Sequence, residues 1–146
     1  MIKWNLSHTE AGWIAGILLG GYALSVPILV SLTDRIDARL IYIFGATLTA
    51  GALFGFAYLA SGFWSAFLLR LLAGIGLAGT YMPGLRVLVD RYGGGKEARA
   101  IAFYTACFSL GTAISFFYSG EVASIFGWVI AYKIAGFSAI GSAVFV

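Results

Sequence analysis

Charged residues are scarce in this chain of 146 residues. It has nine basic and six acidic side chains, so 10% of its residues are charged whereas 61% are hydrophobic. A soluble domain is typically about 25% charged, so this composition excludes a soluble globular domain, which would lack a polar coat. Disorder is excluded as well, because disordered chains are poor in apolar residues.

Reactive side chains are also few. The chain has one cysteine, Cys107, and one histidine, His8. A lone cysteine excludes a disulfide within one chain. One residue of each type supplies neither a zinc ligand set nor a choice of nucleophile–base pairs. We therefore expect no enzyme activity, no metal site and no cofactor.

Long apolar runs take the place of charge. Positions 11–33 and 100–120 carry no charged residue, and positions 40–85 carry only Arg70. A bilayer core about 30 Å thick takes roughly 20 apolar residues as helix. One helix over 40–85 would be about 69 Å long, so this region turns back, and the tripeptide at 60–62 is the best break.

These runs predict an all-α fold: a polytopic membrane helix bundle that forms one transmembrane domain over residues 1–146. The expected spans are about 11–32, 40–60, 63–85, 100–118 and 125–146. Ser7 and Glu10 precede the first span with the spacing of a capping box. Gly12, Gly16 and Gly20 share a face of this span, where we expect another helix to pack closely.

The basic residues predict the orientation. The gaps at 33–39 and 86–99 are separated by two spans and therefore share a side of the membrane. They hold six of the nine lysines and arginines: Arg35, Arg39, Arg86, Arg91, Lys96 and Arg99. The positive-inside bias makes this side cytoplasmic, with Met1 outside and Val146 inside. Because basic residues in short membrane loops have this explanation, we expect no nucleic-acid partner.

Two glycine-rich segments resemble phosphate-binding motifs. The segment 74–79 reads Gly-Ile-Gly-Leu-Ala-Gly, but a dinucleotide site needs this pattern between a strand and a helix. Close helix packing is the favoured interpretation. The segment 93–96, Gly-Gly-Gly-Lys, is followed by Glu97 where a phosphate loop needs Ser or Thr, so it predicts a flexible connector.

Asp34 and Asp37 have a spacing that could serve a divalent metal. Arg35 and Arg39 lie beside them and would neutralise their charge, whereas such metals need a shell rich in oxygen. An ion-pair cluster is therefore favoured over a metal site.

Two basic residues lie at membrane depth. Arg70 is about 12 Å into its span, and Lys133 is about two turns into the last one. An intramembrane charge is costly and indicates function by default, although Lys133 can also snorkel to the outer interface. No acidic residue lies at the level of Arg70, so a carbonyl, a water-filled cavity or an element outside these five spans must satisfy its donors.

The segment 32–39, Leu-Thr-Asp-Arg-Ile-Asp-Ala-Arg, resembles the loop between the second and third helices of major facilitator superfamily transporters, Gly-x-Leu-Ala-Asp-Arg-x-Gly-Arg-Arg. Leu32, Asp34, Arg35 and Arg39 match. Val30 and Asp37 replace the two glycines of the motif, and Ala38 replaces an arginine.

A second motif agrees with the first. The segment 70–78, an arginine followed by a glycine-rich stretch, resembles the fourth helix of that family and occurs one helix later, as expected. The resemblance continues at 81–84, 99–102 and 126–128. It implies that the chain corresponds to helices two to six of a twelve-helix transporter, an incomplete domain that lacks the first helix and the second six-helix half. The ends at Met1 and Val146 suggest a fragment or a mis-set gene start.

The resemblance implies roles for residues. Asp34, Arg35 and Arg39 would form a gating charge cluster, which breaks and re-forms during alternating access. Arg70 would bind substrate or take part in coupling. Lys133, Tyr22, Tyr81 and Tyr104 are further candidates, although interhelical hydrogen bonds explain the tyrosines equally well.

The expected function is transport of a small solute between the halves of such a protein, with lipid as the surrounding partner. Two cations and no carboxylate within the spans tilt the expected substrate toward an anion, and the bacterial inner membrane is the expected location. Two alternatives stay open. One is a stand-alone small membrane protein that assembles or regulates a partner, and the other is a membrane enzyme, which the scarcity of reactive groups disfavours.

Overall fold

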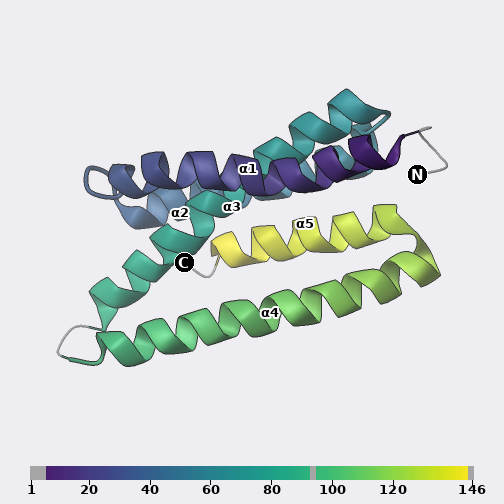
Figure 1. Cartoon of the computed structure of the whole chain (residues 1–146). Coiled ribbons are helices and arrows are strands. Elements are labelled where there is room, and N and C mark those ends of the chain that lie inside the picture. The colour runs from purple at the N-terminus through teal and green to yellow at the C-terminus, as the bar shows by residue number, and fades with distance from the viewer. Residues whose placement is uncertain (1–5, 93–94, 145–146) are drawn as a thin grey trace.

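The computed structural model of the chain describes residues 6–92 and 95–144 (Figure 1). Within these residues it contains no strand, and the predicted all-α fold is confirmed. The helices in chain order are α1 (His8–Leu32), α2 (Ala38–Leu59), α3 (Phe63–Arg91), α4 (Glu97–Phe126) and α5 (Trp128–Val144).

Membrane-length helices form most of this bundle. Among the described residues, the four helices α1 to α4 are long and apolar enough to cross a membrane. The described part of α5 has 17 residues, which corresponds to about 25 Å, so a fifth crossing stays a prediction. The sides assigned to Met1 and Val146, and the first two residues of the predicted 93–96 connector, lie outside the described residues.

The helix boundaries correct part of the prediction. The break at 60–62 is confirmed, but α4 runs on through the segment 119–124, which we expected to be a loop. Polar residues there do not stop the helix. It ends only at Gly127, whose φ of 86° is a left-handed conformation that favours glycine. Likewise α3 extends to Arg91, six residues beyond its predicted end.

Glycine-mediated crossings hold α3 against its neighbours. A Cβ atom added to Gly74 would collide with the backbone carbonyl of Leu18 on α1. One added to Gly45 on α2 would lie 2.7 Å from the Gly76 oxygen and 2.7 Å from the Gly79 carbonyl carbon. Such contacts let helix backbones approach closely where lipid removes the hydrophobic drive. The packing interpretation of segment 74–79 is therefore confirmed.

The predicted glycine face of α1 is not the one that packs. A Cβ atom at Gly12 or Gly16 would meet nothing within 4 Å, whereas one at Gly21 would lie 2.7 Å from the Leu71 oxygen of α3. No described helix therefore packs on Gly12 or Gly16, and the expected contact through Gly12, Gly16 and Gly20 stays a prediction. The contact with α3 uses a different side of α1, and the Gly12 and Gly16 strip stays open.

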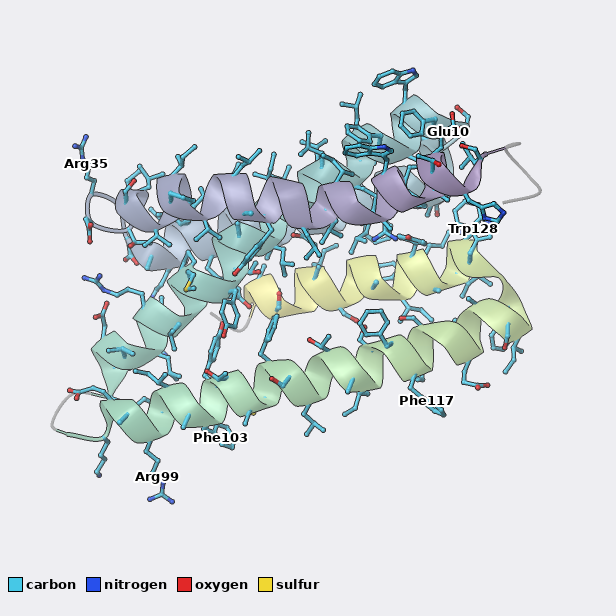
Figure 2. All side chains as sticks on the ribbon, viewed as in Figure 1. Glu10, Arg35, Arg99, Phe103, Phe117 and Trp128 are labelled. Carbon is cyan, nitrogen blue, oxygen red and sulfur yellow. The ribbon has the colours of Figure 1, made fainter. Side chains whose placement is uncertain are left out.

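Helices α4 and α5 form an antiparallel pair beside the bundle of α1, α2 and α3 (Figure 1). Phe54 on α2 and Phe137 on α5 meet edge to face with ring centroids 5.1 Å apart, which joins the two layers. Val122 is the only buried residue that α4 contributes within the described chain. Phe103 and Phe117 of α4 point away from α5 (Figure 2), as side chains in contact with lipid do.

The connections alternate between the two ends of the bundle. The connection at 33–37, the end of α3 at Arg91 and the start of α4 at Glu97 lie at one end, and the connection at 60–62 lies at the other (Figure 1). The capping box at the start of α1 is confirmed: the Glu10 amide donates to Ser7 Oγ at 3.2 Å, and the Ser7 amide donates to Glu10 Oε2 at 2.8 Å.

Candidate functional site: the Arg70 cavity and the charged end

Arg70 lies on α3, where it faces an aromatic pair contributed by two other helices. Its guanidinium carbon is 5.3 Å from the ring centroid of Phe56 on α2 and 5.3 Å from that of Tyr132 on α5. These two rings stack with centroids 4.4 Å apart. The guanidinium therefore lies beside the stacked pair, at the same distance from both rings.

The aromatic contacts do not satisfy the arginine completely. Its Nε atom is buried and has no hydrogen-bond partner, and Arg70 forms no ion pair with any residue that the structure describes. A buried donor left without a partner costs about 1–3 kcal/mol, and more when it belongs to a charged group. Arg70 therefore retains the capacity to bind an acceptor.

A cavity of about 480 Å³ opens next to Arg70. Helices α2, α3, α4 and α5 all contribute to its wall, and Ser115 and Ser119 of α4 lie among the lining residues with Trp128 and Tyr132 of α5. None of the described residues that line it is acidic. Its size falls within the range of about 300–1,000 Å³ that is usual for small-molecule sites.

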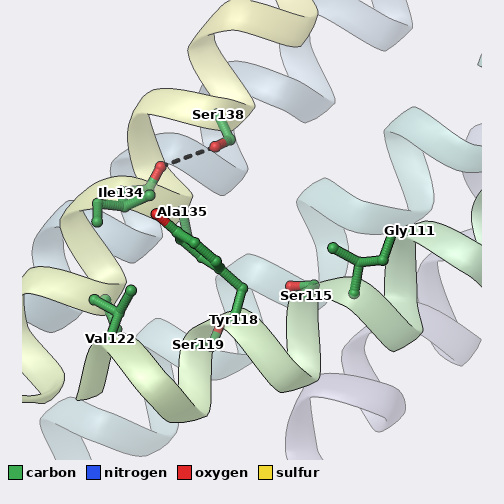
Figure 3. A pocket seen from close by; sticks show the side chains of 10 residues that line it. Gly111, Ser115, Tyr118, Ser119, Val122, Ile134, Ala135 and Ser138 are labelled. Carbon is green, nitrogen blue, oxygen red and sulfur yellow. Dashed lines mark hydrogen bonds between the residues drawn. The ribbon is translucent and has the colours of Figure 1, made fainter. Parts of the chain in front are cut away.

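The same two serines also line a second cavity, of about 390 Å³, between α4 and α5 (Figure 3). Ser109 and Thr112 of α4 donate hydrogen bonds to carbonyls of their own helix. The hydroxyls of Ser115 and Ser119 make no such bond to any described residue. Their hydrogen-bonding capacity is therefore available within the two cavities.

The other predicted site residues lie elsewhere. The Lys133 Nζ atom is 4.7 Å from the ring centroid of Tyr58, and Lys133 is not among the residues that line the Arg70 cavity. Tyr104 donates a hydrogen bond of 3.0 Å to the Tyr81 carbonyl oxygen, and their rings are 5.6 Å apart, so they connect α4 to α3. Tyr22 does not line the Arg70 cavity either.

A second polar site lies at the charged end of the bundle, where a cavity of about 700 Å³ is lined by the 33–39 segment and the end of α3. Arg86 links two acidic residues there: its Nη1 is 3.6 Å from Asp34 Oδ1, and its Nε is 3.4 Å from Asp90 Oδ1. All three side chains are at least half exposed. Exposed pairs of this kind contribute only about 0–1 kcal/mol each.

This geometry corrects the expected pairing within the 34–39 segment. In the described residues Asp34 pairs with Arg86, and neither Arg35 nor Arg39 forms an ion pair. Arg35 points away from the bundle (Figure 2). Asp37 caps α2 by accepting a 2.9 Å hydrogen bond from the Arg39 amide, which occupies a carboxylate oxygen that a metal would need.

Arg86 was missed as a site residue because the sequence placed it in a loop. Its four-residue spacing from Asp90 is the signal that could have identified it, since such pairs face each other on a helix. No group of three or more His, Cys, Asp or Glu side chains in the described chain could hold a metal ion.

Comparison with known families decides the broader assignment. A family model described as Major Facilitator Superfamily matches residues 1–146. The chain belongs to this superfamily. The resemblance seen in the 32–39 and 70–78 segments is thereby confirmed. Comparison with curated proteins and with solved structures gave no match.

Membership in the Major Facilitator Superfamily places the chain among secondary transporters. Together with its four membrane-length helices, it makes the chain an integral membrane protein surrounded by lipid. Members of this superfamily are not enzymes in general, in agreement with the scarcity of reactive side chains.

Proposed function

We propose that the chain takes part in the transport of a small anionic solute by alternating access, and that the Arg70 cavity holds the solute. The observation that carries this proposal is the buried, unpartnered Nε of Arg70 next to a cavity of about 480 Å³. A basic residue at membrane depth marks a substrate or ion pathway by default. With no acidic residue among the described lining, an anion is the natural counterion.

The charged end would act as the gate. Asp34, Arg86 and Asp90 connect the 33–37 segment to the end of α3. Arg35 lies in the same segment, and Arg39 is exposed in the first turn of α2. Ion pairs at the surface contribute little stability, which suits contacts that must break and re-form in each cycle. We place this end in the cytoplasm because its connections are rich in basic residues, which favour the cytoplasmic side. We place the protein in a bacterial inner membrane.

Faces of α1 and α4 would contact further membrane helices. The strip at Gly12 and Gly16 is open, and most residues of α4 are exposed, with Val122 the only buried one in the described chain. We propose a first helix and a second six-helix half as the occupants of these faces. The second candidate function, assembly with a different membrane protein, would use the same open strip on α1.

The transport proposal is tested by measuring solute uptake into membrane vesicles from cells that express the chain from its natural gene. Arg70→Ala should abolish concentrative uptake of the transported solute, while Arg70→Lys should keep part of it because the charge remains. The basic residue Arg99 is exposed and points away from the helices (Figure 2), so Arg99→Gln is the matched control. Equal uptake by Arg70→Ala and Arg99→Gln would contradict the role of Arg70.

A further inference from the structure

The walls of the Arg70 cavity carry information about the kind of anion that fits. This inference rests on the proposed transport function and specifies its substrate class. We propose that the cavity selects a carboxylate attached to a flat apolar body, such as an aromatic ring. Three features support this class: the number of cations, the arrangement of the rings and the position of the free hydroxyls.

A single cation implies a single negative charge. Arg70 is the only basic residue among those that line the cavity in the described chain, and Lys133 contacts Tyr58 instead. A second negative charge on the ligand would stay unpaired, which is costly away from water. The planar guanidinium matches a carboxylate in geometry, because its parallel N–H groups bind both oxygens. A dianion such as phosphate is therefore disfavoured.

The rings form a corner that suits a flat ligand. Trp128 and Tyr132 both line the cavity, and their planes are inclined at 81° with centroids 6.2 Å apart. A flat ring in such a corner stacks on one side chain and presents its edge to the other, the two arrangements that aromatic groups prefer. A saturated ring of the same size cannot stack in this way.

Arg70 lines the same cavity as these two rings. Its contacts with Phe56 and Tyr132 hold the guanidinium against the aromatic pair, while the Nε atom stays without a hydrogen bond. A carboxylate at the guanidinium would thus extend its ring along the Trp128 and Tyr132 walls. Ser115 and Ser119 lie on the α4 wall, where their free hydroxyls can bind a polar substituent of the ring.

Equilibrium binding to the purified full chain in lipid nanodiscs tests this class with four probes. Benzoate is flat and anionic, cyclohexanecarboxylate is anionic but not flat, benzamide is flat but neutral, and phosphate has no apolar body. We expect benzoate to bind at least about tenfold more tightly than benzamide, because only benzoate carries a charge that Arg70 can pair with. It should also bind more tightly than cyclohexanecarboxylate, which cannot stack on the rings, and than phosphate, whose second charge stays unpaired. Equal binding of phosphate and benzoate would overturn the class.

Variants then assign the selectivity to residues. Arg70→Gln should remove the preference for benzoate over benzamide, whereas Arg99→Gln should keep it. Trp128→Leu should remove the preference for benzoate over cyclohexanecarboxylate, and Trp64→Leu, at a side chain that is 72% exposed, should not. Circular dichroism of each variant separates lost selectivity from lost helices. Full benzoate preference in folded Arg70→Gln or Trp128→Leu would overturn the proposal.

The outcome also separates this inference from the transport proposal. Selective benzoate binding without any uptake would support the substrate class and contradict transport. Uptake of a different solute that depends on Arg70, together with no benzoate preference, would support transport and overturn the class.

Discussion

Replacing Gly74 by alanine tests the glycine-mediated crossing at which α3 meets α1. The new Cβ atom would collide with the Leu18 carbonyl and lie 3.1 Å from the Tyr22 amide nitrogen. Both contacts are with backbone, so no side-chain rotation can relieve them and the helices must separate. The matched control is Gly16→Ala on α1, where an added Cβ atom meets nothing within 4 Å.

The expected magnitudes follow from two opposing effects. Overpacking a close contact costs about 1–3 kcal/mol, and the rigid backbone contacts at Gly74 place it near about 3 kcal/mol. Alanine in a helix gains about 1 kcal/mol over glycine. Gly74→Ala should therefore lose about 2 kcal/mol of unfolding free energy, whereas Gly16→Ala should gain up to about 1 kcal/mol.

Unfolding of the chain in mild detergent micelles by added sodium dodecyl sulfate, followed by circular dichroism, measures both variants. Gly45→Ala at the crossing of α2 and α3 provides a second test, since its Cβ atom would lie 2.7 Å from the Gly76 oxygen. Unfolding free energies that are the same for Gly74→Ala and Gly16→Ala would refute the packing described for α3.

Three further substitutions have matched or conservative controls. Asp34→Asn removes the ion pair with Arg86 and should slow uptake while it changes the free energy of unfolding by less than about 1 kcal/mol. The control Asp37→Asn keeps a helix cap and should keep wild-type uptake. Wild-type uptake by Asp34→Asn as well would refute the gate. Tyr104→Phe removes the hydrogen bond to Tyr81 and should cost about 1 kcal/mol, measured by detergent unfolding. Tyr118→Phe, whose hydroxyl makes no hydrogen bond to a described residue, should cost less, and an equal loss would contradict the α3–α4 contact. Ser7→Ala removes the α1 cap and should cost about 1 kcal/mol, most of which Ser7→Asp should restore; hydrogen exchange at the Glu10 amide that does not rise in Ser7→Ala would contradict this.

The helical bundle was predictable because its main signal is local. An apolar run of about 20 residues must satisfy its backbone within itself in lipid, and a helix does so. The break at 60–62 followed from length alone, since no single helix over 40–85 fits the bilayer. The end of α4 was not predictable from polarity, because Ser119 and Glu121 are compatible with a helix that continues to the membrane surface.

The packing faces depend on tertiary geometry, which the spacing of glycines does not contain. Gly12 and Gly16 have the regular spacing of a packing strip, but Gly21 makes the contact with α3. The spacing states which residues share a face, and only the crossing of the helices decides which face is used. The close packing of segment 74–79 was predicted in kind, although its partners Leu18 and Gly45 were not.

Of the candidate site, only the buried cation Arg70 was predictable from the sequence. Arg70 stood out because placing a cation at membrane depth costs free energy and therefore indicates a function. Its aromatic partners come from α2 and α5, and no sequence spacing brings Phe56 and Tyr132 together. The partner of Asp34 was predicted among its sequence neighbours and is instead Arg86, 52 positions along the chain, on a helix that extends further than its apolar run.

The roles of Arg70 and Asp34 require that the 33–37 and 92–96 connections face the cytoplasm and that 60–62 faces outward. Cys107→Ser removes the only cysteine, so single cysteines at Arg39, Lys96 and Ser61 can be labelled with a membrane-impermeant maleimide. We predict that intact spheroplasts are labelled only at Ser61→Cys and that inside-out vesicles are labelled only at Arg39→Cys and Lys96→Cys. Labelling of Arg39→Cys and Lys96→Cys from opposite sides would contradict this topology.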